Sequence, residues 1–394
     1  MKKRISILGS TGSIGESCLQ VINEKKNLFI LDTFVANSNF KKICMQIKKF
    51  KPIKFVIINY STYQKVKKKY KNNKIQILNN FNFLKNTKKK FDITVAAIPG
   101  IAGLEATIKF TKKSNKLLIA NKESIICGWG LLSKIIKQKK IKVVPLDSEH
   151  FSIHQLTKNY NDNEIDKIYI TASGGPFLNL KKNKFDKIKP KDAIKHPKWK
   201  MGNKISVDSS TLMNKILELM EAIKIFPFNI EKYEIIIHPQ SLVHAIVKFK
   251  NGLTKLLYHE PNMAIPISNG LLDTKFDYNN FKFSQKNKIN IIKNLEFIKV
   301  DPKRFPMINF VKKINIYKST PIILNGANEI LVDQFLKSKI SFNSMYKFLS
   351  LVLKDKNYIK YATRSCNKLK KIYIIDTWAR NTTLKIVEKG TKYK

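Results

Sequence analysis

Arginine is scarce in this chain. Only four of its 75 basic residues are arginine (Arg4, Arg304, Arg364 and Arg380), although the formal net charge is +47. So basic a protein could bind nucleic acid, but base readout and phosphate clamping favour the guanidinium group. The lysines are spread along the whole chain, without basic–aromatic repeats. This pattern favours solvated lysine faces over a specific nucleic-acid surface.

Paired cysteines and long apolar runs are also missing. The four cysteines lie far apart and form no CxxC motif, which argues against a disulfide framework or a cysteine metal site. No apolar run approaches the ~20 residues that span a bilayer. The N-terminal sequence MKKRISILGSTGSIG lacks the long apolar region and cleavage site of a signal peptide. We therefore expect a cytoplasmic protein with no membrane partner.

Short apolar strands alternate with helical patterns over roughly the first 145 residues. RISIL, LFILDTFVA, KFVII, FDITVAA, KLLIA and KVVPL are predicted strands, and most are followed by a segment with helical periodicity. Such alternation is typical of an α/β fold with a parallel, doubly wound sheet. We expect a Rossmann-like dinucleotide-binding domain at residues 1–146.

The pattern changes after residue 150. The segment YEIIIHPQSLVHAIVKFKNGLTKLLYHEP predicts consecutive strands, with a hairpin turn at Asn251-Gly252. We expect a central α+β catalytic domain at residues 147–272, which would bind metal and substrate and form a dimer interface. A polar connecting arm at 273–300 and a C-terminal helical bundle at 301–394 would follow.

Three glycines, Gly9, Gly12 and Gly15, follow the first predicted strand. Glycines at a strand-to-helix turn let the backbone approach a pyrophosphate at the helix N-terminus. An NAD site usually has an acidic residue at the end of the second strand, where it binds the ribose 2′-hydroxyl. Here that strand ends in Asn37-Ser38-Asn39. Because no carboxylate there would repel a 2′-phosphate, we expect NADPH as the cofactor.

Two carboxylates, Asp147 and Glu149, follow the strand KVVPL, at the carboxyl end where α/β sheets bind ligands. Acids this close repel each other unless a cation or a proton joins them. Oxygen ligands suit Mg²⁺ or Mn²⁺ better than zinc, and Glu218 could supply a third carboxylate. Lys122, also after a strand, could move a proton beside a metal-bound hydroxy-ketone.

The segment DSSTLMNKILELMEA, residues 208–222, places polar groups on an otherwise apolar helix. Asp208 or Ser209 could cap this helix at its start. Asn214 and Lys215 offer hydrogen-bond donors that suit a phosphate. Glu218 lies one turn beyond Asn214 and therefore faces the same side. One helix could thus supply both donors to an anion and a metal ligand.

Taken together, the motifs resemble one family along nearly the entire chain. GSTGSIG, ANKES, LDSEH, SGGPF, HPKWKMG, KISVDSSTLMNK and HPQSLVHAIV occur in the order seen in 1-deoxy-D-xylulose 5-phosphate reductoisomerases. The resemblance implies isomerisation of 1-deoxy-D-xylulose 5-phosphate and its NADPH-dependent reduction to 2-C-methyl-D-erythritol 4-phosphate, a step of non-mevalonate isoprenoid biosynthesis. It also implies a homodimer with one Mg²⁺ or Mn²⁺ per subunit.

The same resemblance implies a role for individual residues. The expected cofactor-binding residues are Thr11, Gly12, Ser13, Ile14, Asn37, Ser38, Asn39, Asn121, Glu123 and Gly202. The expected metal ligands are Asp147, Glu149 and Glu218. The expected substrate-binding residues are Lys122, Ser148, Glu149, Ser173, His196, Trp199, Ser209, Asn214, Lys215 and Glu218, among which Lys122, Glu149 and His196 would be catalytic. Trp199 would lie on a loop that closes over the substrate, with Met201 nearby.

The chain departs from the family pattern in three places. Ser38 stands where the family commonly has lysine, and Ile216 where it usually has glycine. The segment YHEPNMAIPISNG follows the family pattern only loosely. Two alternative functions remain open from the residues alone: a simpler NADP-dependent dehydrogenase without a metal requirement, and a lysine-rich nucleic-acid-binding protein.

Overall fold

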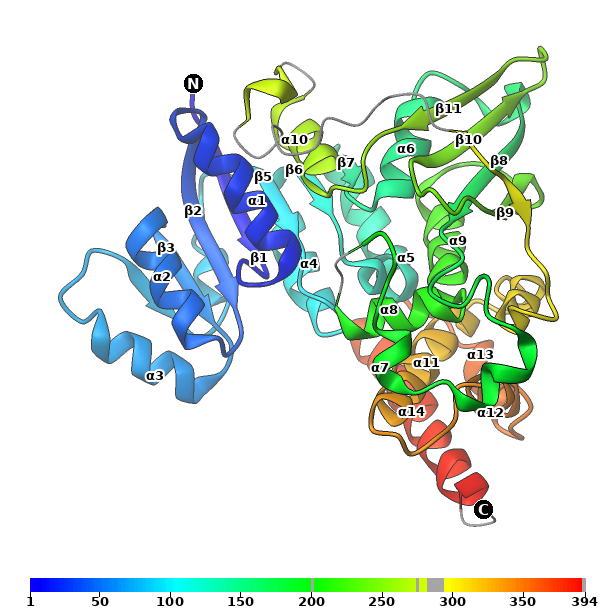
Figure 1. Cartoon of the computed structure of the whole chain (residues 1–394). Helices are drawn as coiled ribbons and strands as arrows, with labels where there is room; N and C mark the ends of the chain where they lie inside the picture. The colour runs from blue at the N-terminus through cyan, green and yellow to red at the C-terminus, as the bar shows by residue number, and fades with distance from the viewer. Residues whose placement is uncertain (200–201, 274–275, 282–293, 392–394) are drawn as a thin grey trace. The chain divides into compact units, whose positions relative to one another are not determined.

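The computed structural model describes residues 1–199, 202–273, 276–281 and 294–391 (Figure 1). The chain forms two compact units. Unit 1 comprises Met1–Ser124, Gly130–Phe151 and Asn262–Asn290, and unit 2 comprises Ile125–Trp129, Ser152–Pro261 and Ile291–Lys394, each as far as described. Much of the predicted connecting arm, at 274–275 and 282–293, lies outside the described residues.

Unit 1 contains a seven-stranded sheet in the order β4-β3-β2-β1-β5-β6-β7. Every neighbouring pair is parallel, which confirms the predicted doubly wound α/β fold. The strand order reverses between β1 and β5, and ligands of such sheets bind outside the carboxyl ends of the strands at this reversal. The strands are β1 Lys3–Leu8, β2 Phe29–Ala36, β3 Lys54–Ile57, β4 Gln76–Leu78, β5 Phe91–Ala96, β6 Ser114–Ile119 and β7 Lys142–Pro145.

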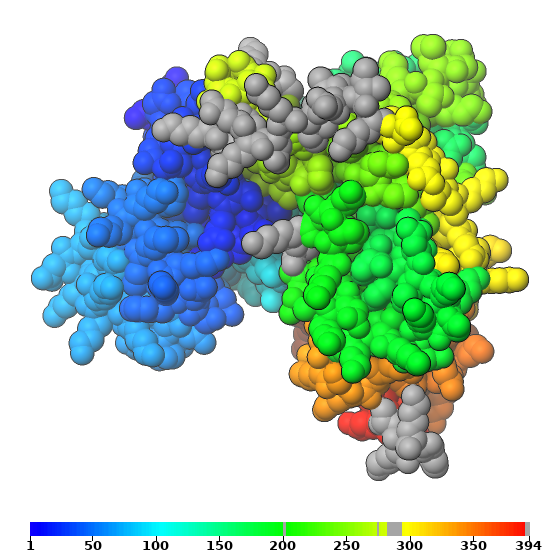
Figure 2. Space-filling model, in the orientation of Figure 1, coloured from blue at the N-terminus to red at the C-terminus, as the bar shows by residue number. Residues whose placement is uncertain are grey.

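Helices connect these strands, and the sheet between them is buried. Ile5 and Ile7 of β1 have no exposed surface, and Phe34 of β2 contacts Phe55 of β3 edge-to-face, at 5.9 Å between ring centroids. In the space-filling view the first strands and helices form one continuous body, drawn in blue (Figure 2). The helices are α1 Ser13–Glu24, α2 Phe40–Phe50, α3 Tyr60–Lys69, α4 Gly103–Thr111, α5 Lys122–Lys139, α6 Ser148–Thr157 and α10 Ala264–Leu272.

Asp273 ties the end of α10 back to the sheet of unit 1. Its carboxylate accepts hydrogen bonds from Lys116 at 2.5 Å and from Lys3 at 3.1 Å. Burial alone would raise the pKa of Asp273, but the two lysines outweigh burial and lower the pKa to about 2. Lys116 also donates to the carbonyl oxygen of Gly270. A segment distant in sequence is therefore fixed to the strands by charged contacts.

Unit 2 contains a five-stranded sheet in the order β11-β10-β8-β9-β12. β8 and β9 are parallel and the other neighbours are antiparallel. The predicted Asn251-Gly252 hairpin is confirmed between β10 and β11, where Gly252 adopts φ +86°. The strands are β8 Ile165–Ala172, β9 Tyr233–Ile237, β10 Val243–Phe249, β11 Thr254–Tyr258 and β12 Ile298–Lys299.

Helices fill the connection from β8 to β9 and dominate the C-terminal part of unit 2. Arg380 of α14 donates to Asp376 at 2.7 Å and also to Glu329 of α11, which links these two helices. Among the described residues, no helix is both long and apolar enough to cross a membrane. The helices are α7 Pro190–Ala193, α8 Asn203–Ser210, α9 Met213–Ile225, α11 Thr320–Leu336, α12 Ser344–Val352, α13 Tyr358–Ala362 and α14 Leu369–Thr391.

Candidate active site

The glycine loop leads from β1 into α1. The Gly12 N–H donates to the Gly9 carbonyl at 3.0 Å, which closes the turn. A Cβ on Gly15 would collide with the Gly9 carbonyl oxygen and the Ser10 backbone, so only glycine allows the loop and helix to pack this closely. Gly12 is the N-cap of α1 and has no side chain to cap it. The first N–H groups of α1 are therefore suited to an anion such as a pyrophosphate.

The exit of β2 carries the predicted run Asn37-Ser38-Asn39, whose side chains are exposed. The Asn39 side-chain oxygen accepts the Lys42 N–H at 3.0 Å and thereby caps α2. The run therefore leaves only hydroxyl and amide groups for a nucleotide.

Asn121 has a structural task of its own at the start of α5. Its side-chain oxygen accepts the N–H of Ser124 and caps the helix, while its amide nitrogen donates to the carbonyl oxygens of Ile98 and Gly100. These bonds hold the loop after β5 against the helix that begins with Lys122. Glu123, the next predicted cofactor residue, lies largely buried in the same first turn.

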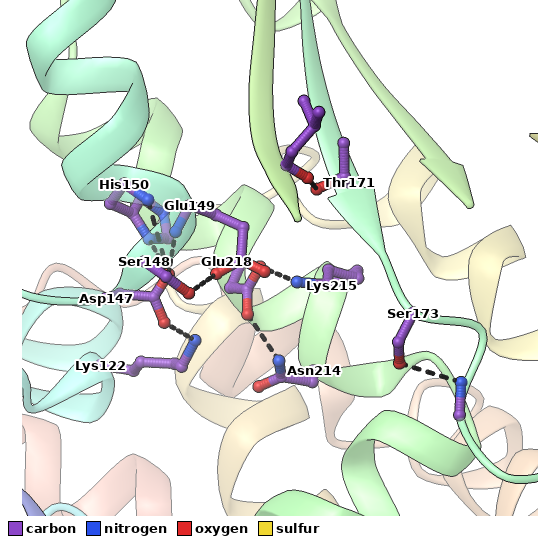
Figure 3. A network of polar contacts seen from close by, with 12 residues as sticks. Lys122, Asp147, Ser148, Glu149, His150, Thr171, Ser173, Asn214, Lys215 and Glu218 are labelled. Carbon is purple, nitrogen blue, oxygen red and sulfur yellow. Dashed lines mark hydrogen bonds and ion pairs between the residues drawn. The ribbon is translucent and has the colours of Figure 1, made fainter. Parts of the chain in front are cut away.

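Asp147 lies at the start of α6 and has several partners at once (Figure 3). Its Oδ2 atom lies 2.5 Å from the Lys122 ammonium, and its Oδ1 atom lies 3.0 Å from Nδ1 of His150. The same Oδ1 atom accepts the backbone N–H of Glu149 at 3.2 Å. The Ser148 hydroxyl donates to the Glu149 carboxylate. His150 was not predicted from the sequence, although LDSEH places it three residues after Asp147.

Glu218 lies on α9, where it is almost fully buried. Its carboxylate accepts hydrogen bonds from the Asn214 amide at 2.5 Å and from the Lys215 ammonium at 2.8 Å. Asn214, Lys215 and Glu218 therefore share one side of the helix, as their spacing predicts (Figure 3). A buried carboxylate paired in this way is held in a fixed position, as a metal ligand or substrate contact requires.

The predicted helix start at Asp208 or Ser209 is wrong. Both residues lie inside α8, and a separate helix, α9, begins at Met213. Leu212 between them adopts a left-handed conformation with φ +66°. Asp208 is instead bound by the Asn328 side-chain amide at 2.7 Å. The segment thus turns between two helices, which places Ser209 and Glu218 on different elements.

Three acidic side chains in the described part of the chain could hold a metal ion together. Asp147, Glu149 and Glu218 each offer one carboxylate oxygen, and these oxygens lie within 4.8 Å of one another. Carboxylate oxygens are the ligands that Mg²⁺ and Mn²⁺ prefer. The geometry therefore fits the predicted ligand set.

Ser173, just after β8, pairs with His196. The Ser173 hydroxyl lies 2.9 Å from Nε2 of His196, and the Trp199 N–H donates to Nδ1 at 2.8 Å. Because Nδ1 accepts, neutral His196 carries its proton on Nε2, which faces the hydroxyl. Burial, aided by the charge of Lys215, lowers the pKa of His196 to about 4, so the ring is neutral near pH 7.

Gly175 lets the loop after β8 approach α8. It has φ +64°, and a Cβ there would lie 3.0 Å from the Ser209 carbonyl oxygen, so the two chain segments touch. Ser173 and Ser209 are thereby brought to the same region of unit 2. Gly202 lies exposed immediately before α8, whereas Met201 lies outside the described residues.

Three family models match the chain. They describe 1-deoxy-D-xylulose 5-phosphate reductoisomerase at residues 5–129, its C-terminal domain at 143–226, and a further DXP reductoisomerase C-terminal domain at 259–382. The chain belongs to the 1-deoxy-D-xylulose 5-phosphate reductoisomerase family. The resemblance seen in the sequence motifs is thereby confirmed.

Individual relatives agree with the family assignment. The reductoisomerase of Pelagibacter ubique is 44% identical over 364 residues, which cover 91% of this chain and 93% of the relative. The reductoisomerase structure from Zymomonas mobilis in complex with NADPH has a TM-score of 0.87 at 31% identity, covering 98% of this chain and 100% of that chain. A reductoisomerase structure with NADPH, fosmidomycin and magnesium has a TM-score of 0.88 at 29% identity, covering 98% of both chains.

Proposed function

We propose that this chain converts 1-deoxy-D-xylulose 5-phosphate to 2-C-methyl-D-erythritol 4-phosphate, with NADPH and one Mg²⁺ or Mn²⁺ per subunit. The observation that carries the proposal is the group of three carboxylates, Asp147, Glu149 and Glu218, with oxygens within 4.8 Å of one another. A simpler dehydrogenase does not require three clustered carboxylates. In a nucleic-acid-binding protein, these carboxylates would repel the phosphates of the nucleic acid. The family assignment supports the same choice.

Asp147, Glu149 and Glu218 would hold the divalent ion, which would supply Lewis-acid chemistry at the substrate carbonyl and an adjacent hydroxyl. Lys122, 2.5 Å from Asp147, would donate a hydrogen bond to the reacting oxygen or move a proton there. The Ser148 hydroxyl would contact a substrate hydroxyl. The pairing of Lys122 with Asp147 offsets part of the repulsion between neighbouring carboxylates.

The substrate phosphate would bind to donors of unit 2. Nε2–H of His196 donates to the Ser173 hydroxyl oxygen at 2.9 Å, and both groups could instead donate to an anion. Lys215 adds an ammonium group, and because Lys215 is largely buried, its charge is poorly screened there. The proposed phosphate-binding set is Ser173, His196, Ser209, Asn214 and Lys215.

NADPH would supply hydride to the aldehyde formed by the isomerisation. The backbone and side chains of Thr11, Gly12, Ser13 and Ile14 would bind its phosphates, and Asn121, Glu123 and Gly202 would line the rest of its site. Trp199 would cover the ligands and exclude water. The assembly as a homodimer is a proposal that follows from the sequence resemblance, whereas the cytoplasmic location and the four-part domain division are proposals that follow from the sequence pattern.

The test is Glu218→Gln, which keeps the side-chain shape and removes the charge. Manganese binding would be measured by electron paramagnetic resonance, and turnover by NADPH absorbance at 340 nm with the substrate present. We expect Mn²⁺ affinity to fall at least ~10-fold, since the lost charged contact is worth ~1.5–3 kcal/mol, and turnover to fall further. Glu234 is a half-buried acid on β9 of the same unit, so Glu234→Gln is the matched control. It should change neither the manganese affinity nor the turnover.

Two results would contradict the proposal. One is wild-type turnover that proceeds at full rate after the divalent ion is removed by a chelator. The other is a Glu218→Gln protein that is folded and retains wild-type manganese affinity. Either would show that the three carboxylates serve the structure alone.

A further inference from the structure

The exit of β2 offers a nucleotide 2′-phosphate no positive charge of its own. Asn37, Ser38 and Asn39 are neutral, and the Asn39 side-chain oxygen is already used to cap α2. A 2′-phosphate carries close to two negative charges at neutral pH, and neutral donors bind it more weakly than a cation does. If this chain prefers NADPH, a cation must reach this position from elsewhere in unit 1.

Lys42, in the first turn of α2, directly follows this exit and brings a cation to the glycine loop. Its ammonium lies 3.4 Å from the carbonyl oxygen of Thr11 in the glycine loop and 2.7 Å from a carboxylate oxygen of Glu16 in α1. One turn further along α2, Gln46 donates to the Ser10 carbonyl at 2.8 Å. The side of α2 that carries Lys42 and Gln46 therefore faces the glycine loop, and the backbone N–H of Lys42 donates to Asn39 at the exit of β2.

We propose that Lys42 is the residue that recognises the 2′-phosphate of NADPH in this chain and sets its preference over NADH. The inference rests on the proposed NADPH-dependent function. The Lys42–Glu16 ion pair is partly exposed, with 38% and 39% of the two side chains accessible, so it is a weak pair. An ammonium has three donors, and Lys42 can give one to a phosphate while it keeps its contact with Thr11. Lysine here performs the task that an arginine performs in other NADP sites.

The test compares the binding of NADPH and NADH to the full chain without substrate, by titration of nicotinamide fluorescence. Lys42→Met keeps the length of the side chain and removes its charge. We expect the Kd for NADPH to rise ~10- to 100-fold, as for the loss of one charge-assisted hydrogen bond, and the Kd for NADH to change less than about 3-fold. Lys42→Arg should retain the preference. Adenosine 2′,5′-bisphosphate should compete with NADPH on the wild type and at least ~10-fold less well on Lys42→Met.

Lys41→Met is the matched control, because Lys41 is exposed on the same turn of α2 and its loss changes the net charge equally. It should leave the ratio of the two Kd values unchanged. Equal weakening of NADPH and NADH by Lys42→Met would mean that Lys42 only braces the loop and would overturn the inference. A wild type that binds NADPH without preference over NADH would overturn it too. A wild type that binds neither nucleotide would instead contradict the proposed function.

Discussion

His259 should make unit 2 less stable in mild acid. The ring is 8% exposed and stacks on His244 at 3.9 Å between centroids, with 19° between the ring planes. Its Nδ1 lies 2.6 Å from the Glu260 carbonyl oxygen and donates to it. Burial, aided by the neighbouring His244, lowers the pKa of His259 from 6.5 to about 3.

The size and sign of the effect follow from this shift. Between pH 6.5 and pH 3 the unfolded chain binds a proton at His259 and the folded chain does not. The free energy of unfolding therefore falls as the pH falls, by at most ~1.4 kcal/mol per pH unit from this residue. Protonation of the unfolded chain begins above pH 6.5 and is nearly complete at pH 5.5, so between pH 7.5 and pH 5.5 we expect a loss of about 1.4 kcal/mol.

The perturbation is His259→Phe, which keeps an aromatic ring against His244 and removes the titrating group. Urea unfolding would be followed by tryptophan fluorescence, because Trp129, Trp199 and Trp378 all lie in unit 2. We expect the difference in unfolding free energy between pH 7.5 and pH 5.5 to shrink by about 1.4 kcal/mol. A change that is equal at both pH values reflects repacking and does not enter the comparison.

Tyr258→Phe is the control, because it changes the side chain next to His259 in the sequence and leaves every histidine in place. Its pH dependence should match that of the wild type. His196 and His238, whose pKa values burial also lowers, keep part of the slope in every variant. If His259→Phe loses as much stability on acidification as the wild type, the buried ring accepts a proton in the folded state and the reasoning is wrong.

Two further substitutions test the backbone. Gly15→Ala should weaken NADPH binding at least ~10-fold and destabilise unit 1 by ~1–3 kcal/mol, since its Cβ would meet the Gly9 carbonyl; fluorescence titration and urea unfolding measure the two effects. Gly130→Ala is the control, because a Cβ there meets nothing within 4 Å; it should change neither NADPH binding nor stability. Ser338→Gly should stabilise unit 2 by about 0.5 kcal/mol, because Ser338 follows α11 with φ +58°. A fall in the urea midpoint of Ser338→Gly would contradict this reasoning. The control is Lys337→Gly, at the preceding exposed residue of the helical turn, which should lower the stability.

Much of the fold could be predicted because its signals are local. Strand-length apolar runs separated by helical patterns predicted the parallel sheet, and Asn251-Gly252 predicted the hairpin between β10 and β11. The glycine loop was also predictable, because close backbone approach leaves a direct mark on the sequence. Each of these features depends on residues near one another in the chain.

The break between α8 and α9 left no such mark. Leu212 adopts φ +66°, a conformation that leucine rarely takes, and neither glycine nor proline stands near it in SSTLMNK. Leu212 and Met213 are buried, and the Thr211 hydroxyl accepts the Met213 N–H at 3.3 Å, so packing and a short-range hydrogen bond both stabilise the break. The uninterrupted helical pattern of the segment made a single helix the natural prediction.

The candidate site was predicted as a set of residues but not as a set of contacts. Lys42 looked like one more solvated lysine, since its approach to Thr11 depends on how α2 packs against a loop some thirty residues earlier. The stacking of His244 on His259 likewise depends on pairing between β10 and the chain after β11. Such contacts between distant segments have no periodicity or spacing from which they could be predicted.

The several partners of Asp147 have a consequence for mutagenesis. Because one oxygen caps the first turn of α6 and the other meets Lys122, alanine at this position would weaken a helix end and remove a proposed metal ligand in the same protein. Asparagine would keep an oxygen for the backbone amides while it discards the charge. An alanine scan would therefore overstate what Asp147 contributes as a proposed metal ligand, and the difference in stability between the alanine and asparagine variants would measure the helix cap.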